Sequence, residues 1–282
     1  MSMQAIEPEV LRPEDAAVVR AQAAAEIDMQ ISTAKRYPRD VARSVDKAKA
    51  LATRNREIAK SCEFAKPVTV RGKKEFIRGP SIRLAEIVLS TWGNLRVAAQ
   101  VVDEGRAYVT CQATVHDLES NVAVRTETRR SIVYSATGDR AGRRFSDDLV
   151  TTTTNAAMAI AMRNAVFKAV PRSIVDEVLE AAKAILVKER KEVPLDLRRK
   201  RAIEWFEKCG VAEEFVCRLL NKPEAALIDE ADLETLQGVR VGLDEGTQSV
   251  DELLEEIDAK TKELDPGAYD VGKPDLDGPA AK

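Results

Sequence analysis

The chain has 282 residues, of which 44% are hydrophobic and 32% are charged, enough for one sizeable core and a smaller second module. It contains no apolar run as long as a membrane span and no hydrophobic signal region after its N-terminus, so we expect a cytoplasmic protein rather than a secreted one. Its four cysteines form no Cys-x-x-Cys pair. We therefore expect reduced thiols in the core rather than disulfides or a zinc site.

The net charge of −3 conceals a strong separation of charge along the chain. Residues 31–190 carry 29 Lys and Arg against 18 Asp and Glu, whereas residues 191–282 carry 13 against 23 and residues 1–30 carry 2 against 6. A basic body with acidic ends favours a polyanion as the partner of the body. The alternative is ordinary solvated charge, which the asymmetry alone does not exclude.

The first third of the chain predicts two helices and an extended segment. Residues 14–32 are Ala-rich, and a second helix opens at Tyr-Pro-Arg-Asp, with the proline in its first turn, and covers residues 37–60. Residues 62–76 read as a short extended segment or hairpin. Gly79-Pro80-Ser81 then supplies helix-start chemistry, and apolar residues follow at helical spacing from Ile82 to Trp92.

Three strands are predicted next, over residues 96–102, 107–116 and 122–134, with turn-rich segments between them. The middle strand alternates between apolar and polar residues, and turns this short imply an antiparallel meander with one wet face. A helix over residues 155–170 has many alanines, which permit close approach, and we expect it to cover the dry face. The polar, Thr-rich residues 147–154 are a candidate for a fourth strand.

The remainder reads as helices. Residues 172–192 form an amphipathic pattern, Pro194 marks a boundary, and residues 197–257 read as short helices that close with the capping box Ser249-x-x-Glu252. Pro, Gly and Asp dominate from Asp265 onward, so we expect a disordered tail.

The predicted fold is α+β: a three- to four-stranded antiparallel β-meander covered by a long helix, with N-terminal helices and a small α-helical C-terminal module. The predicted domains are a core with its N-terminal helices over residues 1–190, an acidic helical module over residues 191–262, and a disordered tail over residues 263–282.

Signals of an enzyme are poor. His116 is the single histidine and lies on a predicted strand without a clear catalytic partner. No phosphate-binding P-loop is present. Asp147 and Asp148 could be grouped with Glu127 or Asp139 for a magnesium-dependent nuclease, but solvated turn acids are the commoner explanation. We therefore expect no enzyme and no cofactor.

Basic residues around the predicted sheet give a better signal for nucleic acid. They are Lys66, Arg71, Lys73, Lys74, Arg125, Arg129, Arg130, Arg140, Arg143 and Arg144. Such residues contact phosphates without base specificity. Because 4% of residues are aromatic, the chain does not read as a stacking platform of the kind that coats single strands. Gripping the backbone while leaving base edges free is what strand annealing requires.

The order of elements resembles the annealing core of the Rad-fifty-two superfamily. Val97–Tyr134 aligns with the sheet of that superfamily and Asn155–Lys168 with its long helix. The strings Tyr37-Pro38-Arg39-Asp40, Gly79-Pro80-Ser81-Ile82-Arg83-Leu84-Ala85-Glu86 and Trp92-Gly93-Asn94 look like a group of bacteriophage proteins placed in that superfamily.

This resemblance implies ATP-independent binding of single-stranded DNA and annealing of complementary strands in phage recombination. It implies a ring or helical homo-oligomer in the cytoplasm of an infected bacterial host. The acidic C-terminal helices resemble modules that dock a phage exonuclease or a host single-strand-binding protein. The inner groove of the family implies roles for Lys66 or the Arg71–Lys74 cluster, and for Arg163 with Lys168. Those last two lie about 140° apart on a helical wheel, which departs from the family's pattern.

The predicted DNA-binding residues are Lys66, Arg71, Lys73, Lys74, Arg125, Arg129, Arg140, Arg143, Arg144, Arg163 and Lys168, with no catalytic or metal-binding residue. Two alternatives stay open: a metal-dependent nuclease of phage DNA metabolism, and a non-enzymatic phage assembly or adaptor protein.

Overall fold

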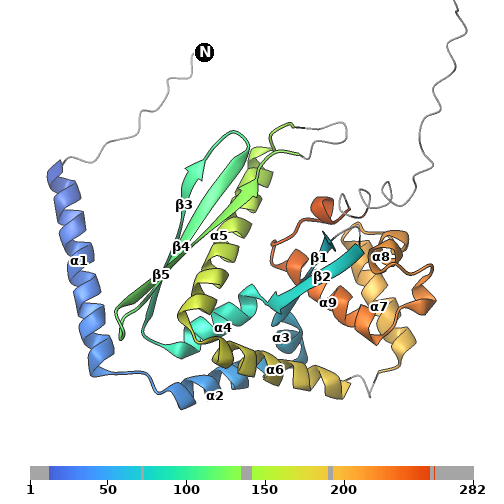
Figure 1. The fold of residues 1–282 in the computed structure, drawn as a ribbon, viewed down its shortest axis with the longest axis horizontal. Coiled ribbons are helices and arrows are strands. Elements are labelled where there is room, and N and C mark those ends of the chain that lie inside the picture. Colours follow the sequence, from blue (N-terminus) through green and yellow to red (C-terminus); the bar gives the residue numbers. More distant parts are fainter. Residues whose placement is uncertain (1–12, 71–72, 135–141, 190–192, 255–256, 258–282) are drawn as a thin grey trace, which may run out of the picture. The chain divides into compact units, whose positions relative to one another are not determined.

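The computed structural model describes residues 13–70, 73–134, 142–189, 193–254 and 257. The chain forms two compact units (Figure 1). The first is built from the segment that ends at Cys62 and from Ile82–Lys183, and the second from Glu63–Ser81 and the chain from Ala184 onward. The predicted domain boundaries near residues 190 and 262 stay a prediction, because residues next to both lie outside the described part.

The first unit begins with three helices: α1 (Pro13–Arg36), α2 (Val41–Ala52) and α3 (Arg56–Ser61). A single helix over residues 37–60 was expected, and this was wrong because polar side chains start two separate helices. The Asp40 side chain accepts from the backbone N–H of Arg43 at 3.0 Å and caps α2. The Asn55 side chain accepts from the N–H of Ile58 at 2.9 Å and caps α3.

The predicted α+β core is confirmed. It consists of α4 (Ile82–Trp92), β3 (Leu95–Glu104), β4 (Tyr108–Asp117), β5 (Val122–Ser131) and α5 (Asp147–Ala169). The strands form an antiparallel sheet in the order β3-β4-β5. Helix α5 packs along one face of this sheet, and α4 packs against α2 (Figure 1).

The face of the sheet beneath α5 is dry, as the alternation in β4 predicted. Val109, Cys111, Ala113 and Val115 are completely buried there. The alanines of α5 allow the helix axis to come close to the sheet, and the Thr126 hydroxyl of β5 donates to a backbone carbonyl of α5 at 2.7 Å. Small side chains on the helix therefore bring helix and sheet into direct contact.

The candidate fourth strand at residues 147–154 was wrong, because these residues form the first two turns of α5. The hydroxyls of Thr151 and Thr152 donate to the carbonyls of Asp147 and Asp148 four residues back, at 2.9 and 3.0 Å. Two acids in the first turn also suit the positive end of the helix dipole. Helix α5 thus accommodates these threonines, whose hydroxyls bond within the helix, despite the preference of threonine for strands.

Arg39, between α1 and α2, is the centre of a network that we call the Arg39 clamp. Its Nη2 donates to Asp117 Oδ1 at 2.5 Å and its Nε to Glu119 Oε1 at 2.9 Å. These side chains are 10%, 15% and 21% exposed, in that order. Asn94 Nδ2 donates to Glu119 Oε1 at 2.6 Å and to the carbonyl of Tyr37 at 2.9 Å. The clamp therefore joins the start of α2, the end of β4 and the start of β3.

Electrostatics favour the ionised form of every charged member of the clamp. Burial works against the charges, but the hydrogen bonds among them outweigh it. The pKa of Arg39 is raised above its ordinary value, and the pKa values of Asp117 and Glu119 are lowered. The Arg39 guanidinium also lies 5.0 Å from the centre of the Trp92 ring, a cation–π distance.

The second unit combines the predicted hairpin with the C-terminal helices. Strands β1 (Glu63–Val70) and β2 (Lys73–Pro80) pair antiparallel. Helix α6 (Arg172–Glu189) runs from the first unit into the second, and α7 (Leu195–Lys208), α8 (Glu213–Leu220), the 3₁₀ turn η1 (Ala225–Leu227) and α9 (Glu230–Asp244) follow. The predicted capping box is present: Ser249 and Glu252 each accept from the other's backbone N–H, at 3.0 and 3.1 Å.

The hairpin shares a core with the C-terminal helices. Ala65 of β1 belongs to the same buried cluster as Phe206 and Leu236. Gly238 of α9 faces Ala65 so closely that a Cβ at position 238 would lie 2.5 Å from the Ala65 Cβ. A side chain larger than hydrogen cannot fit there without displacing the hairpin from α9.

We expect Gly238→Ala to destabilise the protein by about 1–3 kcal/mol because the added methyl group overpacks the contact with Ala65. Gly242→Ala, one turn later on α9, is the matched control. Its Cβ would meet its nearest atom at 3.5 Å, and a helix gains up to about 1 kcal/mol from glycine to alanine. Urea unfolding of both variants checks this, and equal stabilisation of the two would contradict the close packing.

We expect Arg39→Ala to cost about 3 kcal/mol, because it leaves Asp117 and Glu119 without their counter-charge. Since folding lowers the pKa of both acids, they stabilise the protein above their ordinary pKa of about 4, and this stability is lost as the pH falls through their lower folded-state values. The variant lacks that contribution at pH 7 already, so it should lose less stability than the wild type on acidification.

Thermal unfolding between pH 7 and pH 3 measures both effects. Arg83→Ala is the control, since Arg83 forms an exposed pair with Glu86 one turn along α4, and a change within about 0.5 kcal/mol is expected. If Arg39→Ala and Arg83→Ala lost the same amount of stability, the clamp would contribute no more to folding than an exposed ion pair does.

Candidate nucleic-acid interface

The face of the sheet opposite α5 is polar, and we call it the open face. It consists of Arg96, Ala98, Gln100 and Asp103 of β3, Tyr108, Thr110, Gln112, Thr114 and His116 of β4, and Ala123, Arg125, Glu127, Arg129 and Ser131 of β5. The strand register places Arg129 opposite Thr110 and Arg125 opposite Thr114. The three charged side chains that β5 contributes to this face are exposed, so a ligand can reach it from solvent.

Helix α1 approaches the end of this face that is farther from Tyr108. Arg96 Nη1 of β3 donates to Glu26 Oε1 at 2.9 Å and to Gln30 Oε1 at 2.8 Å. Figure 1 shows α1 on the other side of the sheet from α5. The part of the open face between His116 and Tyr108 lies beyond these α1 contacts.

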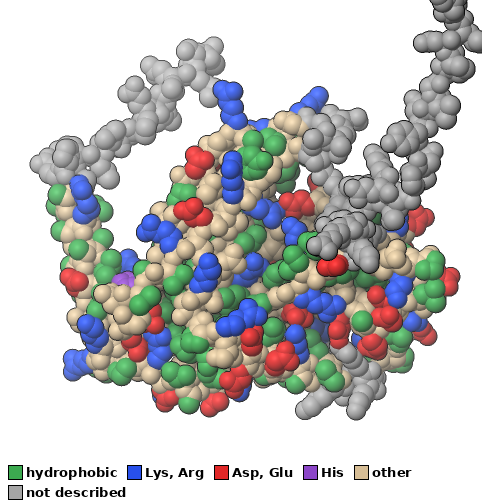
Figure 2. Space-filling model, viewed as in Figure 1, with side chains coloured by type: hydrophobic (Ala, Val, Ile, Leu, Met, Phe, Trp, Pro, Cys, Tyr) green, Lys and Arg blue, Asp and Glu red, His purple; other side chains and the backbone are tan. Residues whose placement is uncertain are grey.

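Two arginines flank one acid on β5. Gln112 Nε2 donates across the strands to Glu127 Oε1 at 2.8 Å. Arg125 and Arg129 lie one on each side of Glu127, each about 7 Å along the strand. The charged row on β5 is therefore net positive, while the exposed acid Asp103 of β3 lies opposite Thr110 on the same face. In the view of Figure 2, Lys and Arg side chains lie along the part of the first unit that contains the sheet, with acidic side chains between them.

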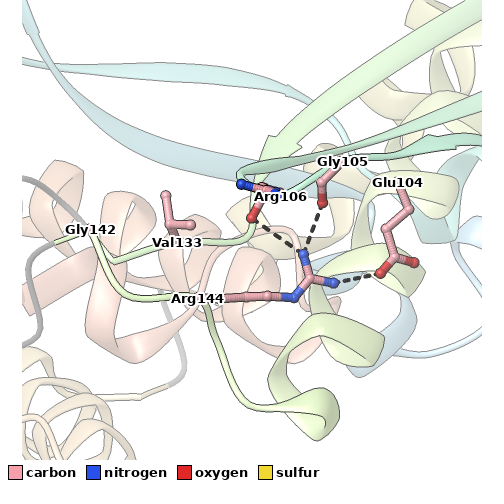
Figure 3. A pocket seen from close by; sticks show the side chains of 6 residues that line it. All are labelled: Glu104, Gly105, Arg106, Val133, Gly142 and Arg144. Carbon is pink, nitrogen blue, oxygen red and sulfur yellow. Dashed lines mark hydrogen bonds and ion pairs between the residues drawn. The ribbon is translucent and has the colours of Figure 1, made fainter.

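More arginines meet at the Tyr108 end of the sheet (Figure 3). Arg144 Nη1 donates to the carbonyls of Gly105 and Arg106, at 2.9 and 3.3 Å, and its Nη2 donates to Glu104 Oε1 at 2.6 Å. A bridge between Val133 and Arg144 holds the backbone there. Arg144 is thus tied to the turn between β3 and β4, and it lines a hollow with Glu104, Gly105, Arg106, Val133 and Gly142.

The neighbouring arginines differ from Arg144 in their surroundings. Arg106 lies in the turn that Arg144 holds, and Arg143 lies next to Arg144, where its carbonyl accepts from Tyr134 N–H at 2.9 Å. Both side chains are exposed. The structure therefore brings four of the predicted residues, Arg125, Arg129, Arg143 and Arg144, to the open face or to its Tyr108 end.

The two predicted residues of α5 do not share this face, because α5 covers the opposite one. Arg163 is partly buried and donates from Nε and Nη2 to Asn164 Oδ1, at 3.2 and 3.1 Å. Lys168 is exposed near the end of the helix.

The remaining predicted residues fall in the second unit or outside the described part. Lys66 is exposed on β1, opposite Ile77 in the hairpin. Lys73 and Lys74 lie on β2, but their side chains are not among those described. Arg71 and Arg140 lie outside the described residues.

The groups considered for metal or acid–base chemistry lie apart. Asp147 and Asp148 are exposed at the start of α5, while Glu127 is bound to Gln112 on the open face, and Asp139 lies outside the described part. Within the described ranges, no three His, Cys, Asp or Glu side chains are arranged to hold a metal ion. His116 Nε2 lies 2.9 Å from Asn121 Oδ1.

The four cysteines are free thiols, of which Cys62, Cys111 and Cys217 are buried. Burial raises the pKa of the Cys111 thiol and, together with the acids Glu213 and Glu224, that of Cys217. Raised pKa values keep these two thiols protonated and unreactive at neutral pH.

Sequence reasoning missed two participants of the site. Tyr108 fell within the predicted strand over residues 107–116 and was given no role, yet the Arg129 guanidinium lies 4.0 Å from the centre of its ring. Glu104 was treated as part of a turn, yet it is the acid that binds Arg144. An aromatic residue on the polar side of an alternating strand was the available signal for Tyr108.

Comparison of the chain with protein-family models, with curated proteins and with solved structures found no match. Among the described residues, no helix combines the length and apolar character that crossing a membrane requires.

We expect Arg144→Ala to lower stability by about 1 kcal/mol, because it leaves two turn carbonyls and Glu104 without their donor. Arg143→Ala removes an exposed side chain of the same type and should change stability by less than about 0.5 kcal/mol. Thermal unfolding of both variants compares two adjacent arginines directly. Equal melting temperatures would show that the contacts of Arg144 contribute nothing to folding.

Proposed function

We propose that this protein binds single-stranded DNA and anneals complementary strands without ATP, as the resemblance to phage proteins of the Rad-fifty-two superfamily implies. The observation that carries the proposal is the open face: one side of the sheet is sealed by α5, and the other presents Arg125 and Arg129 to solvent. Arg106 and Arg143 extend this positive charge at the Tyr108 end.

The chemistry of this face suits a strand whose bases must remain free to pair. Guanidinium groups bind phosphate oxygens through charge-assisted hydrogen bonds, and these contacts carry no base specificity. The threonine and glutamine side chains of β4 offer further hydrogen bonds to sugar and phosphate. A face that holds the backbone in this way leaves base edges available to a complementary strand.

A homo-oligomer is part of the proposal. Within the described residues the sheet has β3 and β5 at its edges, and unpaired strand edges need a cover. Val101 and Val102 of β3 are 41% and 43% exposed, which adds apolar surface to one of these edges. The proposed further partner, a phage exonuclease or a host single-strand-binding protein, would dock on the acidic C-terminal helices.

The test is a gel assay of annealing between complementary oligonucleotides without ATP or metal. Arg125→Gln with Arg129→Gln should weaken binding of single strands, lower the slope of log affinity against log salt by about 1.4, and slow annealing, because two phosphate contacts are lost. Glu127→Gln is the matched control from the same strand. It removes a repelling charge and should tighten binding. Circular dichroism checks that each variant is folded.

Three results would contradict the proposed site or favour one of the alternative functions. Wild-type annealing by the folded double variant would remove the open face from the site. Degradation of the oligonucleotides when magnesium is added would favour the nuclease alternative. Absence of any salt-sensitive DNA binding would favour an assembly or adaptor protein.

A further inference from the structure

Tyr108 is an aromatic side chain that lies on the open face of the sheet, outside the hydrophobic core. It begins β4, belongs to the open face, and is 42% exposed. A packed aromatic side chain looks different: Phe206 is 1% exposed and contacts Trp205 edge-on, with 5.0 Å between ring centres. The exposed ring of Tyr108 carries a guanidinium 4.0 Å from its centre, that of Arg129, which reaches diagonally across from β5.

A tyrosine ring stacked with a guanidinium on an open polar face offers a flat surface on which an unpaired nucleobase can stack. Bases stack on aromatic rings and on the flat face of arginine, and both kinds of surface are present in this pair. Thr110 places a hydroxyl group next to the pair in the strand register, and Arg106 lies in the adjoining turn. The hydroxyl of Ser131, opposite Tyr108, is already bonded to the backbone of Val133. A nucleotide seated here would therefore meet stacking, hydrogen-bonding and charged groups together.

We infer that Tyr108 and Arg129 form a stacking point for one unpaired base of the bound DNA strand. The inference rests on the proposed function. It adds one contact to a base of the DNA strand to the proposed contacts with the DNA backbone. Along β4, Tyr108 and Thr114 are about 20 Å apart, and the open face between them has no second aromatic residue. A strand would be held by one base at the Tyr108 end while its neighbouring bases stay free to pair.

The experiment compares two strands of equal length and charge: oligothymidylate, and the same strand with an abasic site in place of every base, so that no base is left to stack. The wild type should bind oligothymidylate about tenfold more tightly, the usual contribution of one stacked base. Tyr108→Ala should bind both strands equally. Its salt dependence should match the wild type, because no phosphate contact is lost. Tyr108→Phe keeps the ring and should keep the preference.

Tyr37→Ala is the matched control. Tyr37 is 64% exposed and also has an arginine beside its ring, Arg36 at 5.6 Å, but it lies just after α1 and not on the open face. This variant should behave as the wild type does. Tyr108→Leu, which preserves bulk without a π surface, replaces Tyr108→Ala if the latter does not fold, and the prediction for it is the same.

The outcomes separate the inference from the function on which it rests. Equal affinity of the wild type for both strands, or a preference retained in Tyr108→Ala, would overturn the stacking point and leave DNA binding in place. Failure of the wild type to bind either strand would overturn the proposed function itself, and the stacking point with it.

Discussion

The guanidinium of Arg39 holds together the chain segments at which the pairing of β3 with β4 begins. It binds Asp117 at the last residue of β4 and Glu119 in the following turn, and Glu119 in turn binds Asn94, the residue before β3. Asp117 is the register partner of Leu95, so the clamp sits where the β3–β4 ladder starts. A one-residue slip would move every side chain to the other face, and a clamp at the end of the ladder opposes it. The dry face under α5 and the polar open face both depend on that register.

The clamp also gives a structural role to two of the sequence strings on which the proposed resemblance rests. Arg39 comes from Tyr37-Pro38-Arg39-Asp40, and Asn94 comes from Trp92-Gly93-Asn94, two strings more than 50 positions apart in the chain that meet in one network. Gly93 and Asn94 adopt positive φ angles of 76° and 53°, which glycine and asparagine tolerate best. These residues therefore act on the fold, by turning the chain and holding the sheet.

Local sequence patterns predicted most helices and strands correctly. They could not predict which parts of the chain, distant in sequence, pack against each other. The alternation of β4 gave the buried set Val109, Cys111, Ala113 and Val115, because period-two burial is a property of the strand alone. The pattern could not show that the hairpin packs on α9, since the contact of Ala65 with Gly238 joins segments that are remote in sequence. At the candidate site, the sequence showed which arginines are present but not the contacts that each side chain makes. Arg143 and Arg144 are adjacent and chemically identical, and only the fold shows that Glu104 and two carbonyls hold the second one.

The two faces of the sheet depend on each other. A flexible polyanion, the ligand that we propose, would gain affinity from a surface that does not have to be ordered at the moment of binding, because each side chain immobilised on binding costs free energy. The alanines of α5 and the hydrogen bond from Thr126 lock the back of the sheet, so the side chains on its front project from a rigid support. On that support, Gln112 holds Glu127 and Tyr108 holds Arg129, which restrains two charged side chains before any ligand arrives. Close packing behind the sheet and these two contacts therefore limit how far Glu127 and Arg129 have to be ordered when a ligand binds.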